Sequence, residues 1–139
     1  MKTSQKFFHQ LLMLYRPFEN KLNLHLAEHN LHRAQWSILH YLSNNSSATL
    51  VELSHYLYVE KPTVTRTMNR LEELGYVGQV PSKDKREKRT QLTEKGRKVY
   101  TDVRVAIDQY EEDILNGISE QEQLEAIRIM GEIRDNIIK

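Results

Sequence analysis

The chain has 139 residues, with 20 Lys and Arg against 19 Asp and Glu, no Cys, five Gly and three Pro. This length suits one domain, and the low Gly and Pro content argues against collagen-like and low-complexity chains. No stretch approaches the roughly 18 consecutive apolar residues of a membrane span, and the absence of Cys excludes disulfides and Cys zinc sites. Residues 1–10 lack the pattern of a secretory signal, so a cytoplasmic protein is expected.

Positive charge is concentrated in the middle of the chain. Residues 61–98 hold eleven basic and five acidic side chains, whereas residues 99–139 hold four basic and ten acidic ones. A basic segment within a chain of +1 overall charge is typical of a protein that binds a polyanion. Charge alone leaves open the alternative of a basic surface that is simply solvated.

Apolar residues three or four apart predict a long first helix and a shorter second one. The first stripe runs from Phe7 to Leu26 and contains Pro17, which we expect to kink or split the helix near residues 15–16. The second helix is expected over residues 34–42.

The next two predicted helices are short and follow each other closely. Thr49 with Glu52 forms a capping-box pattern that opens a helix through Leu57. Pro62 suits the first turn of the following helix, and Gly75 suits the position just after its end.

The periodicity then changes to that of a hairpin. Residues 76–80 and 89–92 are β-compatible and flank a charged tip, which predicts two strands of a hairpin. Thr93 is placed to cap a further helix, whose apolar residues run from Val99 to Ile114. Ser119 with Glu122 is a second capping box and begins a last helix.

The helix after Pro62 has one apolar and one polar face. At 100° per residue, Val64, Met68 and Leu71 point inward, while Arg66 and Asn69 point outward. Arg can pair with guanine, Asn with adenine, and a Thr methyl with thymine. Two short helices followed by a basic hairpin form the winged helix-turn-helix arrangement, although the polar face alone would also suit an ordinary surface helix.

Several spaced motifs make the chain similar to one family of regulators. The helix-turn-helix and wing segments resemble those of MarR-type transcription regulators, whose wing carries a D-x-R element leading into L-T-x-x-G. The matching segments are Ala34–Leu39, Glu52–Ser54, Lys61–Arg66, Leu71–Val77, Asp84–Arg86 and Gln91–Gly96.

The resemblance implies a mainly α, winged helix-turn-helix protein with a two-stranded wing and terminal dimerisation helices. It implies a single domain over residues 1–139, with the DNA-binding lobe at about 31–96 and helical dimerisation regions at 1–30 and 97–139. The implied function is that of a homodimeric regulator, usually a repressor released by a small-molecule effector. The expected DNA-binding residues are Lys61, Pro62, Thr63, Thr65, Arg66, Asn69, Arg70, Lys83, Asp84, Lys85, Arg86 and Lys88.

Within the wing, the resemblance places Arg86 at a minor groove, with Asp84 orienting it. A carboxylate that fixes the guanidinium would reduce the rotamer entropy lost on binding, about 2 kcal/mol for a free Arg. A solvated charged turn is the alternative for this segment.

The apolar stripes of the terminal helices exceed what a small winged helix can cover alone. Each buried Leu or Ile contributes about 1.5–3 kcal/mol, so exposure of these stripes would be costly. Pairing with a second copy would cover them and present two recognition helices about 34–36 Å apart to a pseudo-palindromic site in double-stranded DNA. An internal helical bundle is the alternative.

Other patterns carry less weight. His25 and His29, with His32 nearby, lack acidic or Cys partners at ligand spacing, so we expect no metal site or cofactor there. The chain contains no G-x-S-x-G, P-loop or G-x-G-x-x-G motif, which argues against an enzyme. Aromatic residues that could line an effector cleft, or simply pack in the core, are Tyr15, Phe18, Trp36 and Tyr41.

A protein-interaction module that keeps the winged-helix shape without binding DNA is the second functional hypothesis. Such a module should lack a basic hairpin and a polar helix face, and this chain has both. Sequence-specific DNA binding is therefore the favoured function.

Overall fold

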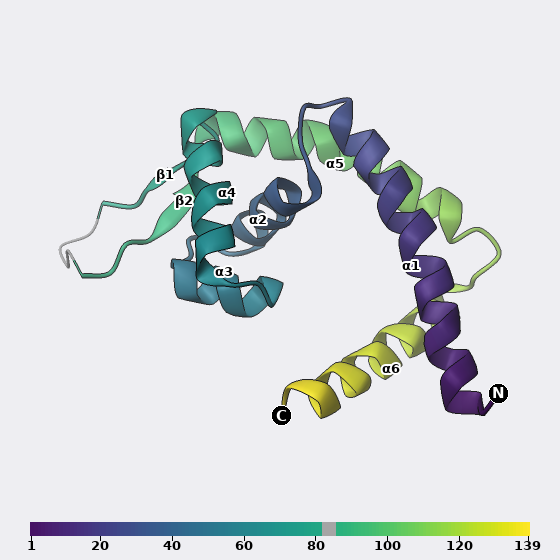
Figure 1. Ribbon diagram of the computed structural model, residues 1–139. Coiled ribbons are helices and arrows are strands. Elements are labelled where there is room, and N and C mark those ends of the chain that lie inside the picture. Colours follow the sequence, from purple (N-terminus) through teal and green to yellow (C-terminus); the bar gives the residue numbers. More distant parts are fainter. Residues whose placement is uncertain (82–85) are drawn as a thin grey trace. The chain divides into compact units, whose positions relative to one another are not determined.

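The computed structural model describes residues 1–81 and 86–139. In these residues the chain forms two compact units, Met1–Ile107 and Asp108–Lys139. The elements, in chain order (Figure 1), are α1 (Thr3–Ala27), α2 (Arg33–Asn44), α3 (Leu50–Leu57), α4 (Lys61–Glu73), β1 (Val77–Gln79), β2 (Thr90–Leu92), α5 (Glu94–Ile114) and α6 (Glu120–Ile138). This mainly helical chain with one two-stranded antiparallel sheet confirms the expected winged helix-turn-helix fold.

Helix α1 is continuous from Thr3 to Ala27, so the expectation that Pro17 splits it is wrong, while the alternative of a kink stays a prediction. The nitrogen of Pro17 carries no hydrogen and cannot donate to the carbonyl of Met13, but the helix continues through this position. Leu22 and Leu26, both after Pro17, are buried, whereas residues 1–17 are exposed.

The core of the first unit is built around α2. This helix contacts α1, α3, α4 and β2. Ile38 and Leu39 of α2 are fully buried, as are Leu53 of α3 and Leu71 of α4. Each such side chain contributes about 1.5–3 kcal/mol by leaving water, so α2 is the element on which the helix-turn-helix is assembled.

The expected caps of the helix-turn-helix are only partly realised. The Thr49 hydroxyl accepts a hydrogen bond from the backbone N–H of Glu52 (3.1 Å), which caps α3 as predicted. The Glu52 carboxylate accepts hydrogen bonds from Arg89 of the wing, so this capping box is half formed. Pro62 lies in the first turn of α4, and Gly75 follows its end with a φ of +80°, a left-handed conformation that glycine adopts at little cost.

The wing is anchored along one edge by a third segment. Strands β1 and β2 pair Val77 with Leu92 and Gln79 with Thr90. Thr90 also exchanges two backbone hydrogen bonds of 2.9 Å with Ala48, in the connection before α3. Figure 1 shows β1 and β2 extending away from the helices at the side of α4.

Thr93 joins the end of α4 to the start of α5. Its hydroxyl donates to the carbonyl of Gly75 (2.6 Å) and accepts from the backbone N–H of Gly96 (3.0 Å). These bonds confirm Thr93 as the cap of α5. They also show what the Thr of the L-T-x-x-G segment does in this fold.

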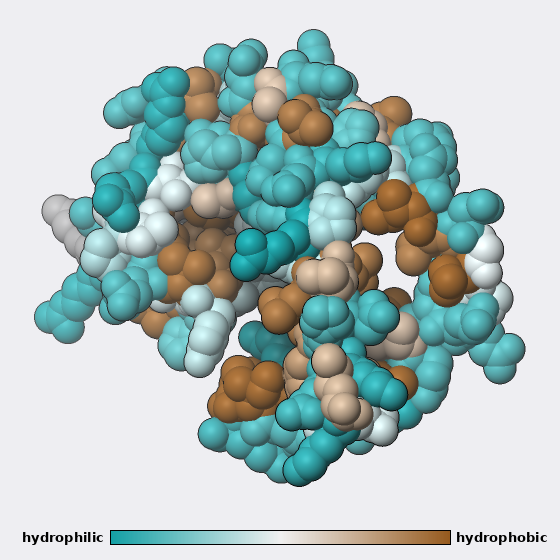
Figure 2. All heavy atoms as spheres, turned by 45° about the vertical axis from the view of Figure 1, so that its right-hand side comes forward, coloured by the Kyte–Doolittle hydropathy of each residue, from teal (hydrophilic) through white to brown (hydrophobic). Residues whose placement is uncertain are grey.

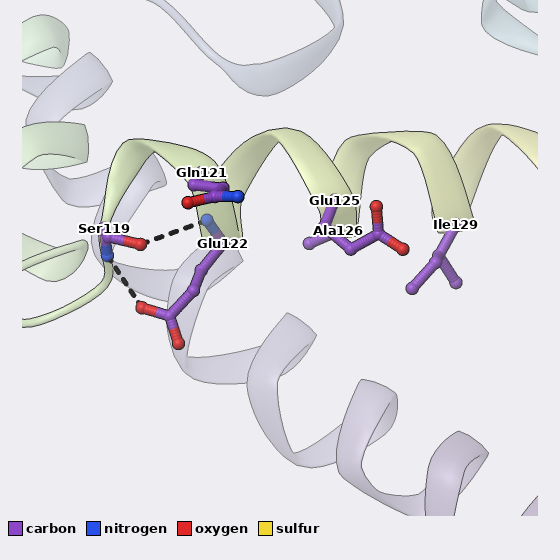
Figure 3. Close-up of a pocket in the computed structure, with 6 residues that line it drawn as sticks. All are labelled: Ser119, Gln121, Glu122, Glu125, Ala126 and Ile129. Atoms are coloured by element: carbon purple, nitrogen blue, oxygen red, sulfur yellow. Dashed lines mark hydrogen bonds between the residues drawn. The ribbon is translucent and has the colours of Figure 1, made fainter.

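The second unit contains α6, whose capping box is complete. The Ser119 hydroxyl accepts from the Glu122 N–H (3.1 Å), and the Glu122 carboxylate accepts from the Ser119 N–H (2.9 Å), as drawn in Figure 3. The backbone N–H and then the hydroxyl of Ser119 lower the pKa of Glu122 below its ordinary value. These two residues also line a shallow pocket along α6 that continues to Ile129 (Figure 3).

Large apolar side chains are exposed along both terminal helices. In α1 they include Phe7, Leu11 and Leu14, and in α6 they include Ile127 and Met130. On the face drawn in Figure 2, hydrophobic residues reach the surface at several places among hydrophilic ones. Within the described residues, no helix is both long and apolar enough to cross a membrane.

Candidate nucleic-acid interface

Helix α4 separates its apolar and polar residues as the sequence predicts. Val64, Met68 and Leu71 are buried, with at most 4% of their surface exposed. The helix packs against α2, α3 and β1 through this stripe. Because the apolar side is held by three elements, the opposite side is presented to solvent in a fixed orientation.

The exposed face of α4 carries most of the predicted DNA-binding residues. Arg66 donates through Nη2 to the Thr63 hydroxyl at 3.4 Å, so the two side chains lie together one turn apart. Arg70 is paired with Glu73 of the same helix (3.0 Å), and exposed pairs of this kind are weak, so the pair can open at little cost. The exposed residues of the predicted set are Lys61, Pro62, Thr63, Arg66, Asn69 and Arg70, while Thr65 is half-buried.

The wing contributes exposed basic residues near its tip. Arg86 and Lys88 are both exposed. The remaining predicted wing residues, Lys83, Asp84 and Lys85, lie outside the described residues. The expected Asp84–Arg86 pairing therefore stays a prediction.

Arg89, at the base of the wing, makes contacts that the sequence did not reveal. Its guanidinium donates to Ser47 (2.7 Å to Oγ), to Glu52 (2.9 Å to Oε1) and to Glu87 (2.9 Å to Oε1). The hydrogen bonds that Arg89 donates to Glu52 and then to Glu87 raise the pKa of Arg89 above its ordinary value. No local pattern predicts the contacts to Ser47 and Glu52, which lie 42 and 37 residues earlier in the chain.

The four aromatic residues considered for an effector cleft differ in their surroundings, and Phe18 is half-buried. Trp36 is buried and stacks on Tyr100 of α5, with ring centroids 4.9 Å apart, so it is a packing residue. Tyr41 lies against Tyr56, with centroids 4.6 Å apart. Of the four, only Tyr15 lines the cavity among helices α1 to α4.

A cavity of about 580 Å³ lies among α1, α2, α3 and α4. It is open to solvent and has a mixed lining of aromatic, aliphatic, hydroxyl and guanidinium groups. Arg33, whose Nε lies 3.3 Å from the Glu19 carboxylate, is its cationic residue. The lining residues are Tyr15, Arg33, Ala34, Ser37, Ile38, Tyr56, Leu57, Val59, Thr63, Val64 and Thr67.

This cavity reaches α4 itself. Thr63 lines it and also lies on the exposed face of α4, beside Arg66. Val64 and Thr67 extend the same wall. Sequence periodicity could place these residues on α4, but not against residues of α1 and α2.

Metal-ligating groups do not gather anywhere in the described chain. Over residues 1–81 and 86–139, no three His, Cys, Asp or Glu side chains lie close enough together to hold an ion.

Comparison with known proteins identifies the lobe and its relatives. Residues 31–96 match the family model of a winged helix DNA-binding domain. The whole chain is similar to an uncharacterized HTH-type transcriptional regulator of Staphylococcus aureus (strain Mu50), with 32% identity over 98% of this chain and 95% of the relative. It is also 36% identical to the uncharacterized HTH-type transcriptional regulator YwoH of Bacillus subtilis, over 86% and 88% of the two chains.

Solved structures share the fold over nearly the full length. A structure of Staphylococcus aureus MarR in complex with salicylate and kanamycin has 31% identity and a TM-score of 0.85, covering 97% of this chain and 92% of that one. The fold of a MarR mutant from E. coli complexed with operator DNA is also shared, with 22% identity, a TM-score of 0.80 and coverage of 92% and 93%.

Fold, interface and relatives agree on one class of protein. The family and fold are those of transcriptional regulators and not of enzymes. The exposed face of α4 and the described part of the wing carry most of the polar and basic side chains predicted to contact DNA. The chain belongs to the MarR family of winged helix-turn-helix proteins and is a DNA-binding transcriptional regulator.

Proposed function

We propose that this protein is a homodimeric repressor that binds a specific, pseudo-palindromic site in double-stranded DNA and is released by a small-molecule effector. The observation that carries the proposal is the polar face of α4, exposed opposite a buried apolar stripe and followed by a basic wing. In this proposal α4 enters the major groove and the wing lies at the minor groove. The proposed location of the protein is the cytoplasm, which contains the DNA in bacteria such as those of the relatives.

Each predicted contact has a distinct chemical role. Arg66 and Asn69 have the groups that read guanine and adenine, and Thr63 adds a hydroxyl and a methyl. Lys61, at the start of α4, meets phosphate together with the backbone amides of that first turn. Residues proposed for the remaining phosphate and minor-groove contacts are Pro62, Thr65, Arg70, Lys83, Lys85, Arg86 and Lys88, with Asp84 orienting Arg86.

Dimerisation is proposed for the terminal helices, residues 1–30 and 97–139. Phe7, Leu11 and Leu14 of α1 are each about half exposed or more, as are Ile127 and Met130 of α6. Apolar surface of this extent on a single chain marks an interface with another macromolecule. A two-fold dimer would cover it and would place two α4 helices on one face of a duplex.

The cavity beside α4 is proposed as the effector site. Its volume of about 580 Å³ is within the range of small-molecule sites. Arg33 can bind a carboxylate and Tyr15 and Tyr56 can pack against a ring, so the proposed effector is a small aromatic acid. Salicylate is present in the Staphylococcus aureus MarR complex, and it is the first probe to use. The α4 helices would adopt one arrangement that fits DNA and one that does not. The effector releases DNA if it binds the second arrangement more tightly than the first.

The test is selection of DNA followed by a salt titration. From genomic fragments or a random duplex library, purified protein should enrich duplexes that share one sequence motif. The consensus of that motif should be pseudo-palindromic. Between 50 and 200 mM salt, binding should weaken about 1000-fold or more, because six or more phosphates are neutralised by the dimer. If no duplex is enriched, or if the affinity for DNA does not change with salt concentration, the protein is better explained as a protein-interaction module.

A further inference from the structure

The guanidinium of Arg89 joins three segments that lie apart in the sequence. Besides the bonds to Ser47, Glu52 and Glu87 given above, it donates through Nη2 to the Ser47 carbonyl (3.2 Å) and to Glu52 Oε2 (3.4 Å). Ser47 precedes α3, Glu52 belongs to the first turn of α3, and Glu87 lies on the returning side of the wing.

These contacts use every donor that Arg89 has. An arginine side chain carries five N–H groups, and this guanidinium makes five hydrogen bonds to protein acceptors. Its side chain is 28% exposed, less than that of either carboxylate partner. Arg89 is therefore unlike Arg66, which lies on the exposed face of α4, although both belong to the basic segment.

The backbone around Arg89 reinforces the same junction. Its carbonyl accepts from the N–H of Val80 (2.9 Å) across the hairpin, and the next residue, Thr90, pairs with Ala48. The returning side of the wing is thus held to the connection before α3 through side chain and backbone together. Arg86 and Lys88 lie on either side of Glu87, one of the residues bound by Arg89.

We propose that Arg89 is a positioning residue that fixes the wing relative to the recognition helix, so that Arg86 reaches DNA while α4 occupies its groove. The route runs from Arg89 through Glu52 to α3, which packs directly against α4. A rigid connection matters because the two DNA contacts have to be made at once, and ordering a loose wing would cost binding free energy. This inference rests on the proposed function, because it concerns how the wing meets DNA.

The first test substitutes Arg89 while keeping its charge. Lysine has three donors on one nitrogen and cannot span Ser47, Glu52 and Glu87. Arg89→Lys should weaken binding to the selected duplex about tenfold. Hydroxyl-radical protection in the minor groove beside the wing should be lost, while protection of guanine N7 by α4 in the major groove should remain. A lysine variant with the affinity and footprint of the unsubstituted protein would overturn the proposal.

A matched pair of acidic substitutions separates positioning from charge. Glu52→Gln and Glu60→Gln each remove one negative charge near the interface, but only Glu52 binds Arg89. Removal of a negative charge by itself strengthens DNA binding, as expected for Glu60→Gln. Glu52→Gln should instead weaken binding and reduce minor-groove protection. Equal strengthening by both variants would show that Arg89 does not act through Glu52.

Amide hydrogen exchange, measured without DNA, tests whether Arg89 holds the wing independently of whether the protein binds DNA. The backbone amides of Ala48 and Thr90 should exchange with solvent about tenfold faster in Arg89→Lys than in the unsubstituted protein, while buried α2 amides such as that of Leu39 keep their rate. If the unsubstituted protein retains no duplex, the proposed function fails and the role in DNA binding fails with it. If it retains a duplex and the exchange rates of Ala48 and Thr90 do not change, only the role of Arg89 is refuted.

Discussion

The Cα of Gly96 lies directly against the backbone carbonyl of Tyr76. A Cβ added at Gly96 would be 1.9 Å from that carbonyl oxygen, far inside van der Waals contact. Tyr76 also accepts a hydrogen bond from Thr93 N–H (3.0 Å) through the same oxygen. The wing and the start of α5 are therefore packed so closely that only glycine fits at position 96.

We therefore expect Gly96→Ala to destabilise the protein by about 1–3 kcal/mol, the usual range for overpacking a tight site. Urea unfolding followed by circular dichroism measures this free energy. Gly131→Ala in α6 is the matched control, because nothing lies within 4 Å of its Cβ position. That control should be neutral or stabilising by up to about 1 kcal/mol, since alanine favours helices. A Gly96→Ala protein as stable as the control would refute the close packing.

The polar face of α4 gives the second prediction. Arg66→Gln should weaken binding to the selected duplex by about 1–3 kcal/mol and relax the preference at one base position, because Arg66 is proposed to read guanine. Fluorescence anisotropy with the selected duplex and its single-base variants measures both effects. Arg128→Gln removes the same charge from α6 and should leave the base preference intact. Identical losses in the two variants would mean that Arg66 contributes only charge.

The cavity between α1 and α4 gives the third prediction. Arg33→Gln should weaken salicylate binding about tenfold, because it removes the cationic group of the cavity. Glu19→Gln should have the opposite effect, since the Glu19 carboxylate lies 3.3 Å from Arg33 Nε and competes with an anion for it. Isothermal titration calorimetry measures both affinities. Equal salicylate affinity in the two variants would place the ligand elsewhere.

The cap of α6 gives the fourth prediction, on pH. The pKa of Glu122 is lowered in the folded chain by the backbone N–H and hydroxyl of Ser119. A carboxyl group of lowered pKa stabilises the fold above its unfolded pKa, and this contribution is lost as the pH falls through the folded value. NMR titration of the Glu122 carboxyl carbon should therefore give a midpoint below the ordinary value of 4.5. In Ser119→Ala, which keeps the backbone N–H, the midpoint should move only part of the way up toward 4.5, and an unchanged midpoint would show that the Ser119 hydroxyl does not contribute.

Local sequence patterns predict the order of the helices and strands and the two faces of α4, but not the continuity of α1 through Pro17. The buried stripe of Val64, Met68 and Leu71 follows directly from helical periodicity. The caps at Thr93 and Ser119 follow from spacing over three residues. These features depend only on residues a few positions apart in the chain, so they can be predicted from the sequence.

Features that depend on distant residues were not predictable in the same way. The half-formed cap at Glu52 arises because Arg89, 37 residues later, takes its carboxylate. The cavity likewise needs α1 and α4 to meet, which periodicity does not specify. The continuity of α1 through Pro17 shows that the surrounding hydrogen bonds outweigh one missing donor.

The central claim is that two copies of this chain bind one duplex through their α4 helices at the same time. Native mass spectrometry of the protein with the selected duplex tests it directly. We expect a complex whose protein mass is that of two 16.5 kDa chains, and a smaller fraction of duplex in that complex when Arg66 is replaced by Gln. A complex with one chain per duplex, or a two-chain complex that persists unchanged without Arg66, would contradict it.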